Sequence, residues 1–216
     1  MAVATLPPPK IKESTFVLNL GAIVEKDSGF VLRLDSNLEL NDDEFFDFCQ
    51  INRDLRIERD EQGEIIIMAP TGWETGSRNA EITMQLQQWA KRNGEGIAVD
   101  SSTGYNLPNK ATRSPDASWV MKERLDTIGA AKRKKFLPLC PDFVIELKSR
   151  TDTLQQLQAK MQEWIANGAQ LGWLIEPDAK RVYVYRPNMQ VETIENANSI
   201  SGDPLLKGFV LDLTQL

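Results

Sequence analysis

Histidine is absent from this chain of 216 residues. Its absence excludes Ser-His-Asp and Cys-His triads, zinc hydrolases with imidazole ligands and iron sites with two histidines. Hydrolytic chemistry must therefore rely on carboxylates, lysines and hydroxyl groups, and any metal ion that takes part would be a hard ion bound through oxygen.

Cysteines and long apolar runs are also scarce. Cys49 and Cys140 have no CxxC spacing and cannot form a structural zinc site alone, so we interpret both as reduced and structural. No apolar run approaches the roughly 20 residues that span a bilayer, and the start of the chain does not resemble a secretory signal. We expect a cytoplasmic protein with no membrane partner. The net charge of -6 argues against a generally basic surface that coats nucleic acid.

The remaining composition is that of an ordinary globular protein, with 41% hydrophobic and 26% charged residues. The length suits one domain. The proline cluster near the start favours an extended segment, so we expect a flexible arm at residues 1–15 and a single domain at 16–216.

Hydrophobic periodicity predicts three helices, with Ser77 and Gly94 bounding the second, and Thr151 or Asp152 capping the third before Gly168 ends it. The helices are expected at 41–52, 76–94 and 151–168. Strand patterns predict a hairpin and further strands, with short β segments after them. They are expected at 55–70, 96–109, 114–121, 139–150 and 171–187. The order from residue 76 is α-β-β-β-α-β.

The stretch "LCPDFVIELKSR" places an acid and a base two residues apart in a strand. Because side chains alternate across a strand, Glu146 and Lys148 should share one face while Ile145 lies on the other. We expect the Ile145 face to be core and the Glu146 face to be charged. The strand "SPDASWV" can bring Asp116 beside Glu146 and Lys148. Two carboxylates and an ammonium group can hold a divalent metal against a phosphodiester and stabilise developing charge.

Simpler interpretations compete at several positions. Glu146 and Lys148 could form only an exposed ion pair on an edge strand, which contributes little stability. Asp142 also follows a proline, but a metal is better chelated from separate strands, which favours Asp116 over Asp142. The basic run from Lys132 to Lys135 is either a solvated segment or a DNA contact. Three tryptophans are expected in the core: Trp89, Trp164 and Trp173.

Pro115-Asp116 followed by Glu146-Leu147-Lys148 resembles the PD-(D/E)xK nuclease pattern. More specifically, the chain resembles the Uma-two family of restriction endonuclease-like proteins over roughly residues 45–213. The short pattern alone is weak, whereas the ordered set of segments is specific. These segments are "MAPTGWETGSRNAEI", "SSTGYNLPN", "SPDASWV", "PDFVIELKSRTDTLQQLQAKMQEWIANGAQLGWLIEP" and "LKGF".

The resemblance implies a role for each matching residue. Asp116 and Glu146 would be metal ligands, Lys148 the catalytic lysine, Glu81 an acid beside the metal, and Lys160 a polar residue reaching the site from the last predicted helix. It also implies an α/β fold with a restriction-endonuclease-like core. Its central mixed sheet would be flanked by helices, with additional N-terminal and C-terminal β segments.

The resemblance further implies use of Mg²⁺, with Mn²⁺ as a substitute, and assembly as a homodimer. We therefore expect a metal-dependent endonuclease acting on DNA. A catalytically dormant nuclease-fold module that binds DNA or a partner is the first alternative. A glycosidase with a carboxylate pair is the second; EDTA would leave the activity of such an enzyme intact.

Overall fold

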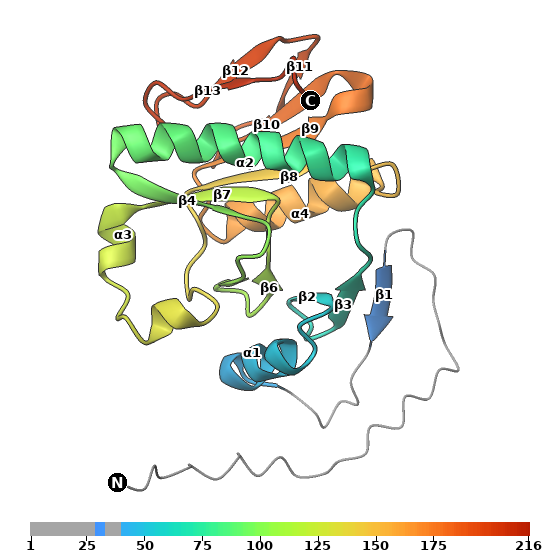
Figure 1. Ribbon diagram of the computed structural model, residues 1–216, viewed down its shortest axis with the longest axis vertical. Helices are drawn as coiled ribbons and strands as arrows, with labels where there is room; N and C mark the ends of the chain where they lie inside the picture. Colours follow the sequence, from blue (N-terminus) through green and yellow to red (C-terminus); the bar gives the residue numbers. More distant parts are fainter. Residues whose placement is uncertain (1–28, 33–39) are drawn as a thin grey trace, which may run out of the picture.

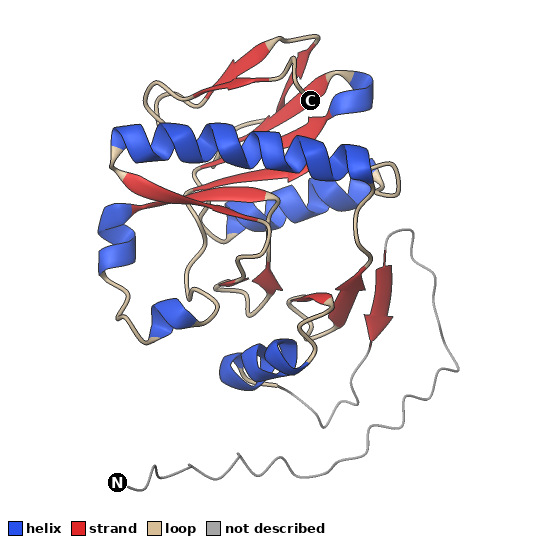
Figure 2. Ribbon diagram, in the orientation of Figure 1, coloured by secondary structure: helices blue, strands red, loops and turns tan. Residues whose placement is uncertain are grey.

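A computed structural model describes residues 29–32 and 40–216 of the chain, so the arm expected at 1–15 lies outside the described residues. The centre is a six-stranded sheet in the order β11-β10-β9-β8-β7-β4 (Figures 1 and 2). It is mixed, because β8 and β9 are parallel while its other neighbouring strands are antiparallel. Its strands are β4 (Gly96–Asp100), β7 (Ala117–Met121), β8 (Phe143–Leu147), β9 (Leu171–Glu176), β10 (Arg181–Tyr185) and β11 (Glu192–Glu195).

Two long helices cover opposite faces of this sheet, α2 (Trp73–Asn93) and α4 (Leu154–Ala166) (Figure 1). The order α2-β4-β7-β8-α4-β9 confirms the predicted α-β-β-β-α-β core of the sheet.

The predicted cap of α2 was wrong. The helix begins one turn earlier, with Gly72 as its N-cap, because Gly76 weakens a helix without ending it and Glu74 suits the first turn. Its end is as predicted, since Gly94 takes the left-handed conformation that glycine adopts readily (φ 75°).

The N-cap of α4 is Thr153, rather than the predicted Thr151 or Asp152. The Thr153 hydroxyl accepts a hydrogen bond from the Gln156 amide. Asp152 instead accepts from the Ser149 amide at 2.8 Å and so closes the turn that leaves β8. Both residues are the type that bonds nearby backbone amides, and the turn decides which one caps the helix.

The predicted alternation of β7 and β8 is confirmed, but the face predicted to be charged rather than core is also buried. Ile145 lies on the α2 face among apolar residues. Val144 lies on the opposite face and is equally buried beneath α4, because the central strands carry a helix on both sides. Glu146 therefore projects into the protein interior.

A second sheet has the order β1-β3-β2-β6-β5 and contains the predicted hairpin, β2 and β3. The segment predicted as one strand at 96–109 is divided between the two sheets. Asp100 Oδ1 accepts hydrogen bonds from the amide and hydroxyl of Ser102 and turns the chain after β4. The strands of this sheet are β1 (Gly29–Leu32), β2 (Arg56–Arg59), β3 (Ile65–Met68), β5 (Tyr105–Asn106) and β6 (Thr112–Arg113).

The other elements are short. Asn41 caps α1 with a capping box, as the sequence of that helix predicts. The Gln85 side chain ties α2 to β13 through the Asp212 amide (2.8 Å) and carbonyl (3.1 Å). No helix in the described part of the chain has the length and apolar character needed to cross a bilayer. The short elements are α1 (Asp42–Ile51), α3 (Lys122–Asp126), η1 (Lys132–Lys134), η2 (Pro177–Ala179), β12 (Ser199–Ser201) and β13 (Val210–Asp212).

Candidate active site

Asp116 and Glu146 lie close together on adjacent antiparallel strands. Asp116 immediately precedes β7, whose Ala117 pairs with Ile145 of β8. The Leu147 amide donates to Asp116 Oδ2 at 2.8 Å, which fastens the carboxylate to the neighbouring strand. Asp116, Glu146 and Lys148 all line one cavity of about 580 Å³, named here the Asp116 cavity. The sequence prediction that these three residues converge agrees with this geometry.

Glu146 is 3% exposed and points toward α4. Its Oε1 accepts a hydrogen bond from Trp164 Nε1 at 2.9 Å and lies 3.0 Å from Lys160 Nζ. Burial raises the pKa of Glu146 to about 7, and the negative charge of Asp116 adds to the rise, while Lys160 opposes it. Burial also raises the pKa of Asp116. Glu146 is therefore poised where small changes in charge alter its protonation near neutral pH.

Lys160 reaches the site from α4, as predicted, but it also contacts an acid that the sequence analysis did not select. Its Nζ lies 3.1 Å from Glu58 Oε1, and Glu58 Oε1 also accepts from the Ser114 amide at 3.0 Å. Glu58 Oε2 pairs with Arg113 at 3.2 Å, and Arg113 Nε pairs with Glu163 at 2.8 Å. A buried chain of alternating charges thus runs from Glu163 to Glu146.

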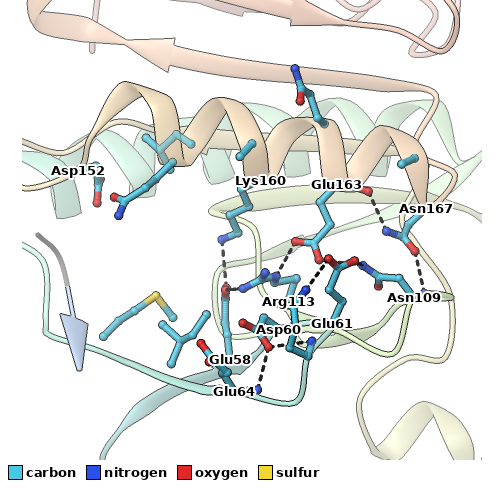
Figure 3. Close-up of a pocket in the computed structure, with 18 residues that line it drawn as sticks. Glu58, Asp60, Glu61, Glu64, Asn109, Arg113, Asp152, Lys160, Glu163 and Asn167 are labelled. Atoms are coloured by element: carbon cyan, nitrogen blue, oxygen red, sulfur yellow. Dashed lines mark hydrogen bonds and ion pairs between the residues drawn. The ribbon is translucent and has the colours of Figure 1, made fainter. Parts of the chain in front are cut away.

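Figure 3 shows the members of this chain from Glu163 to Lys160, where they border a second cavity of about 740 Å³, the Glu163 cavity. Lys160 and Glu163 point from α4 toward Glu58 and Arg113 on the second sheet. Burial raises the pKa of Glu58, but the cations of Lys160 and Arg113 outweigh burial and hold the pKa below its ordinary value. Burial lowers the pKa of Lys160, but Glu146 and Glu58 outweigh it and raise the pKa. Both groups are therefore charged at neutral pH.

Glu58 could not be identified as a site residue from the sequence. It alternates with Ile57 in a hairpin strand, where a charged side chain normally faces solvent. No local signal distinguishes it from Arg56 beside it. The position of the hairpin beneath α4 buries Glu58, and that position is set by contacts between segments far apart in the chain.

Lys148 follows the last residue of β8 and lines the same cavity as Asp116. Its Nζ lies 3.8 Å from Glu176 Oε1 and donates to the Ser149 carbonyl at 3.4 Å. These contacts are long compared with the bonds that hold Lys160. Lys148 is thus the more loosely held of the two lysines.

Glu81 is not brought to this cavity. Its Oε1 accepts from Gln85 Nε2 at 2.9 Å, and it is not among the described residues that line the Asp116 cavity. The α2 residue that contacts Asp116 is Asn79, whose Nδ2 donates to Asp116 Oδ1 at 3.1 Å. The role of Glu81 beside a metal stays a prediction, and Asn79 was missed because an amide in a helix carries no distinctive signal.

Asp142 lies at the other end of β8 and holds structure together there. Its Oδ2 accepts from the Met121 amide at 2.8 Å, and its Oδ1 pairs with Arg124 at 2.7 Å. The basic run also lies outside both cavities: Arg133 pairs with Asp126 and Lys135 with Asp43.

The donor set in the Asp116 cavity fits a hard divalent ion. Among the described residues, every hydrogen bond and ion pair of Glu146 uses Oε1, which leaves Oε2 for a ligand. A cation would also relieve the repulsion that raises the pKa of Glu146 beside Asp116. The described residues contain no group of three histidine, cysteine or acidic side chains suited to a metal. Two carboxylates suit Mg²⁺, which is usually held by one or two carboxylates together with water and substrate phosphate.

Comparisons with known proteins agree with this geometry. No curated protein matches the chain. Among solved structures, the chain is similar to one from Anabaena variabilis described as "a putative nuclease belonging to DUF820". The two share 20% sequence identity over 74% of this chain and 88% of that one, with a TM-score of 0.63, which shows a common fold. A family model named Uma2, described as "Putative restriction endonuclease", matches residues 42–214. The match spans most of the chain, and the protein therefore belongs to the Uma2 family.

Proposed function

We propose that this protein is a metal-dependent endonuclease that hydrolyses phosphodiester bonds in DNA. The observation that carries the proposal is the convergence of Asp116, Glu146 and Lys148 on one cavity from two adjacent strands. Membership of the Uma2 family and the likeness to a nuclease-fold structure support the same class of reaction. Few other kinds of hydrolytic site are available to this chain, because it contains no histidine.

Each residue has a role that follows from its contacts. Asp116 and Glu146 would hold Mg²⁺, with Mn²⁺ as a substitute. The ion would supply positive charge to the phosphate and acidity to the attacking water. Lys148 has an amine with only long contacts, so it is free to turn toward the phosphate and stabilise developing negative charge. Lys160 orients the Glu146 carboxylate and favours its ionised form.

The direct test is to incubate the purified protein with plasmid, linear, single-stranded and branched DNA in Mg²⁺ or Mn²⁺. We expect cleavage of at least one substrate, abolished by EDTA. Asp116→Asn, Glu146→Gln and Lys148→Met should each lower the rate by about 100-fold or more, because each removes a group placed for the reaction. Glu81→Gln tests the remaining predicted ligand separately.

Controls separate loss of chemistry from loss of fold. Each variant should keep a cooperative melting transition, and Asp142→Asn, altered at the far end of β8, should keep its cleavage rate. Full activity in EDTA would point instead to a carboxylate pair acting without metal. DNA binding without cleavage of any substrate would support a dormant module. Homodimer formation stays a prediction, which sedimentation of the full chain tests.

A further inference from the structure

Trp73 is the exception among the five tryptophans of this chain. It is 91% exposed, whereas the other four are buried. Indole rings normally bury most of their area, and tryptophan is enriched at surfaces that contact a partner. Trp73 is the first residue of α2 and lines the Asp116 cavity, so the exposed ring stands at the mouth of the proposed active site.

The surroundings of Trp73 suit a phosphate. Arg150, whose side chain is 80% exposed, lies 3.5 Å from Glu74, and Arg78 lies 3.4 Å from Asp178. The Arg150–Glu74 pair is exposed on both sides, and a pair of this kind contributes little stability and can exchange one anion for another.

The charged residues that line the two cavities favour binding of a DNA strand at the Asp116 cavity rather than at the Glu163 cavity. The Asp116 cavity is lined by five cations and five anions: Arg56, Arg78, Lys148, Arg150, Lys160, Glu74, Asp116, Glu146, Asp152 and Asp178. The Glu163 cavity is lined by two cations and six anions: Arg113, Lys160, Glu58, Asp60, Glu61, Glu64, Asp152 and Glu163. Phosphates are repelled by the second set, so the strand should cross the rim that carries Trp73.

We propose that Trp73 is a stacking platform for an unpaired DNA base next to the cleaved phosphate, and that Arg150 holds the adjoining phosphate. In an intact duplex both faces of a base are covered by its neighbours, so only an unpaired nucleotide can offer a free face to the indole. The proposal rests on the proposed function and gives it a substrate class: DNA with a single-stranded segment, such as a flap or a frayed end.

The test measures binding apart from cleavage. The full chain is titrated, in EDTA, against a fluorescently labelled DNA single strand and against the blunt duplex of the same sequence. Trp73→Ala should weaken single-strand binding by about 10-fold, a typical loss for one stacked base, and should change duplex binding little. Trp73→Phe should restore most of the affinity, because it keeps an aromatic face. Met189→Ala removes another exposed apolar side chain, outside both cavities, and should change neither affinity.

Several results would overturn the proposal. Unchanged single-strand affinity in Trp73→Ala would do so, and so would an equal loss for single strand and duplex. Self-association of the wild type that Trp73→Ala abolishes would assign the ring to a second copy of the chain. Binding of an RNA strand but not of DNA would remove the DNA assignment. Failure of the proposed function looks different: no substrate is cleaved in Mg²⁺ or Mn²⁺, while the effect of Trp73→Ala on binding persists.

Discussion

Ile145 and Glu146 are neighbours on β8 and both are buried, yet they face opposite surroundings. On the α2 face, apolar packing surrounds β8, and the indole N–H groups of Trp119 and Trp173 have no partner among the described residues. On the α4 face, Trp164 donates its indole N–H to Glu146. One face of the sheet is thus held by apolar packing, and the other is organised around buried polar groups.

The difference shows how a small domain combines stability with chemistry. Ionised groups are costly to bury unless each has a partner, and the α4 face supplies partners through Lys160, Arg113 and Trp164. The α2 face carries no such groups at β8 and can stabilise the sheet without constraint from the reaction. Substitutions on the two faces should therefore fail in different ways.

The largest expected effect is on the apolar face. Ile145→Asp should leave the protein unfolded, because it places an unpaired charge among apolar side chains, a change that costs more than about 4 kcal/mol. Ile145→Val is the matched control and should lower the free energy of unfolding by only about 1 kcal/mol. Circular dichroism during thermal melting measures both. A cooperative transition in Ile145→Asp near that of the wild type would show that the two faces do not differ as described.

The next effect compares two lysines on the polar side. Lys160→Met removes the cation between Glu58 and Glu146 and should lower the free energy of unfolding by about 3 to 5 kcal/mol. Lys148→Met should lower it by less than about 1 kcal/mol, because its nearest carboxylate lies 3.8 Å away and its side chain is partly exposed. Urea unfolding at neutral pH in EDTA gives both values. Equal losses of unfolding free energy in Lys160→Met and Lys148→Met would mean that the ion pairs of Lys160 with Glu58 and Glu146 add no stability beyond that of the long Lys148 contacts.

The smallest effect is a pH dependence in EDTA. The pKa of Glu146 rises from an ordinary 4.5 to about 7 on folding, so between these values the folded state binds more protons than the unfolded state. Stability from this group is thus present below pH 4.5 and is lost as the pH rises toward 7. Glu146→Gln should match the wild type near pH 4.5 and exceed its stability by roughly 1 to 3 kcal/mol at pH 8.

The measurement is urea unfolding of both proteins at several pH values. A wild type that gains stability relative to Glu146→Gln as the pH rises would reverse the sign and contradict the raised pKa. Excess Mg²⁺ should reduce the gap at pH 8, since an ion that binds the folded site stabilises it by mass action.

Much of the fold could be predicted because its signals are local. The apolar stripe of α2, the alternation of β7 and β8, and the glycine that ends α2 each depend on residues near one another in sequence. The division of residues 96–109 between two sheets could not be predicted in this way. It depends on which strand each half pairs with, and β5 pairs with β6 rather than with β7.

The same distinction between local and long-range signals applies to the residues of the candidate site. Asp116, Glu146 and Lys148 were identifiable because strand alternation and an ordered motif locate them. Glu58 and Asn79 were not, because each acquires its contact only when distant segments meet: Glu58 with Lys160, and Asn79 with Asp116. Glu81 shows the converse, since a plausible acid on the right helix is turned toward Gln85.

The buried chain of charges also limits which substitutions this protein can accept during evolution. The chain runs from Glu163 through Arg113, Glu58 and Lys160 to Glu146. Among the described residues, losing Lys160 leaves Glu146 without a cation and losing Arg113 leaves Glu163 without one. Replacing either cation alone is therefore costly, whereas replacing it together with an acid that it pairs with is tolerable. In descendants of this chain, these positions should therefore change in pairs of opposite sign or not at all. Neighbouring exposed positions such as Glu61 should vary independently.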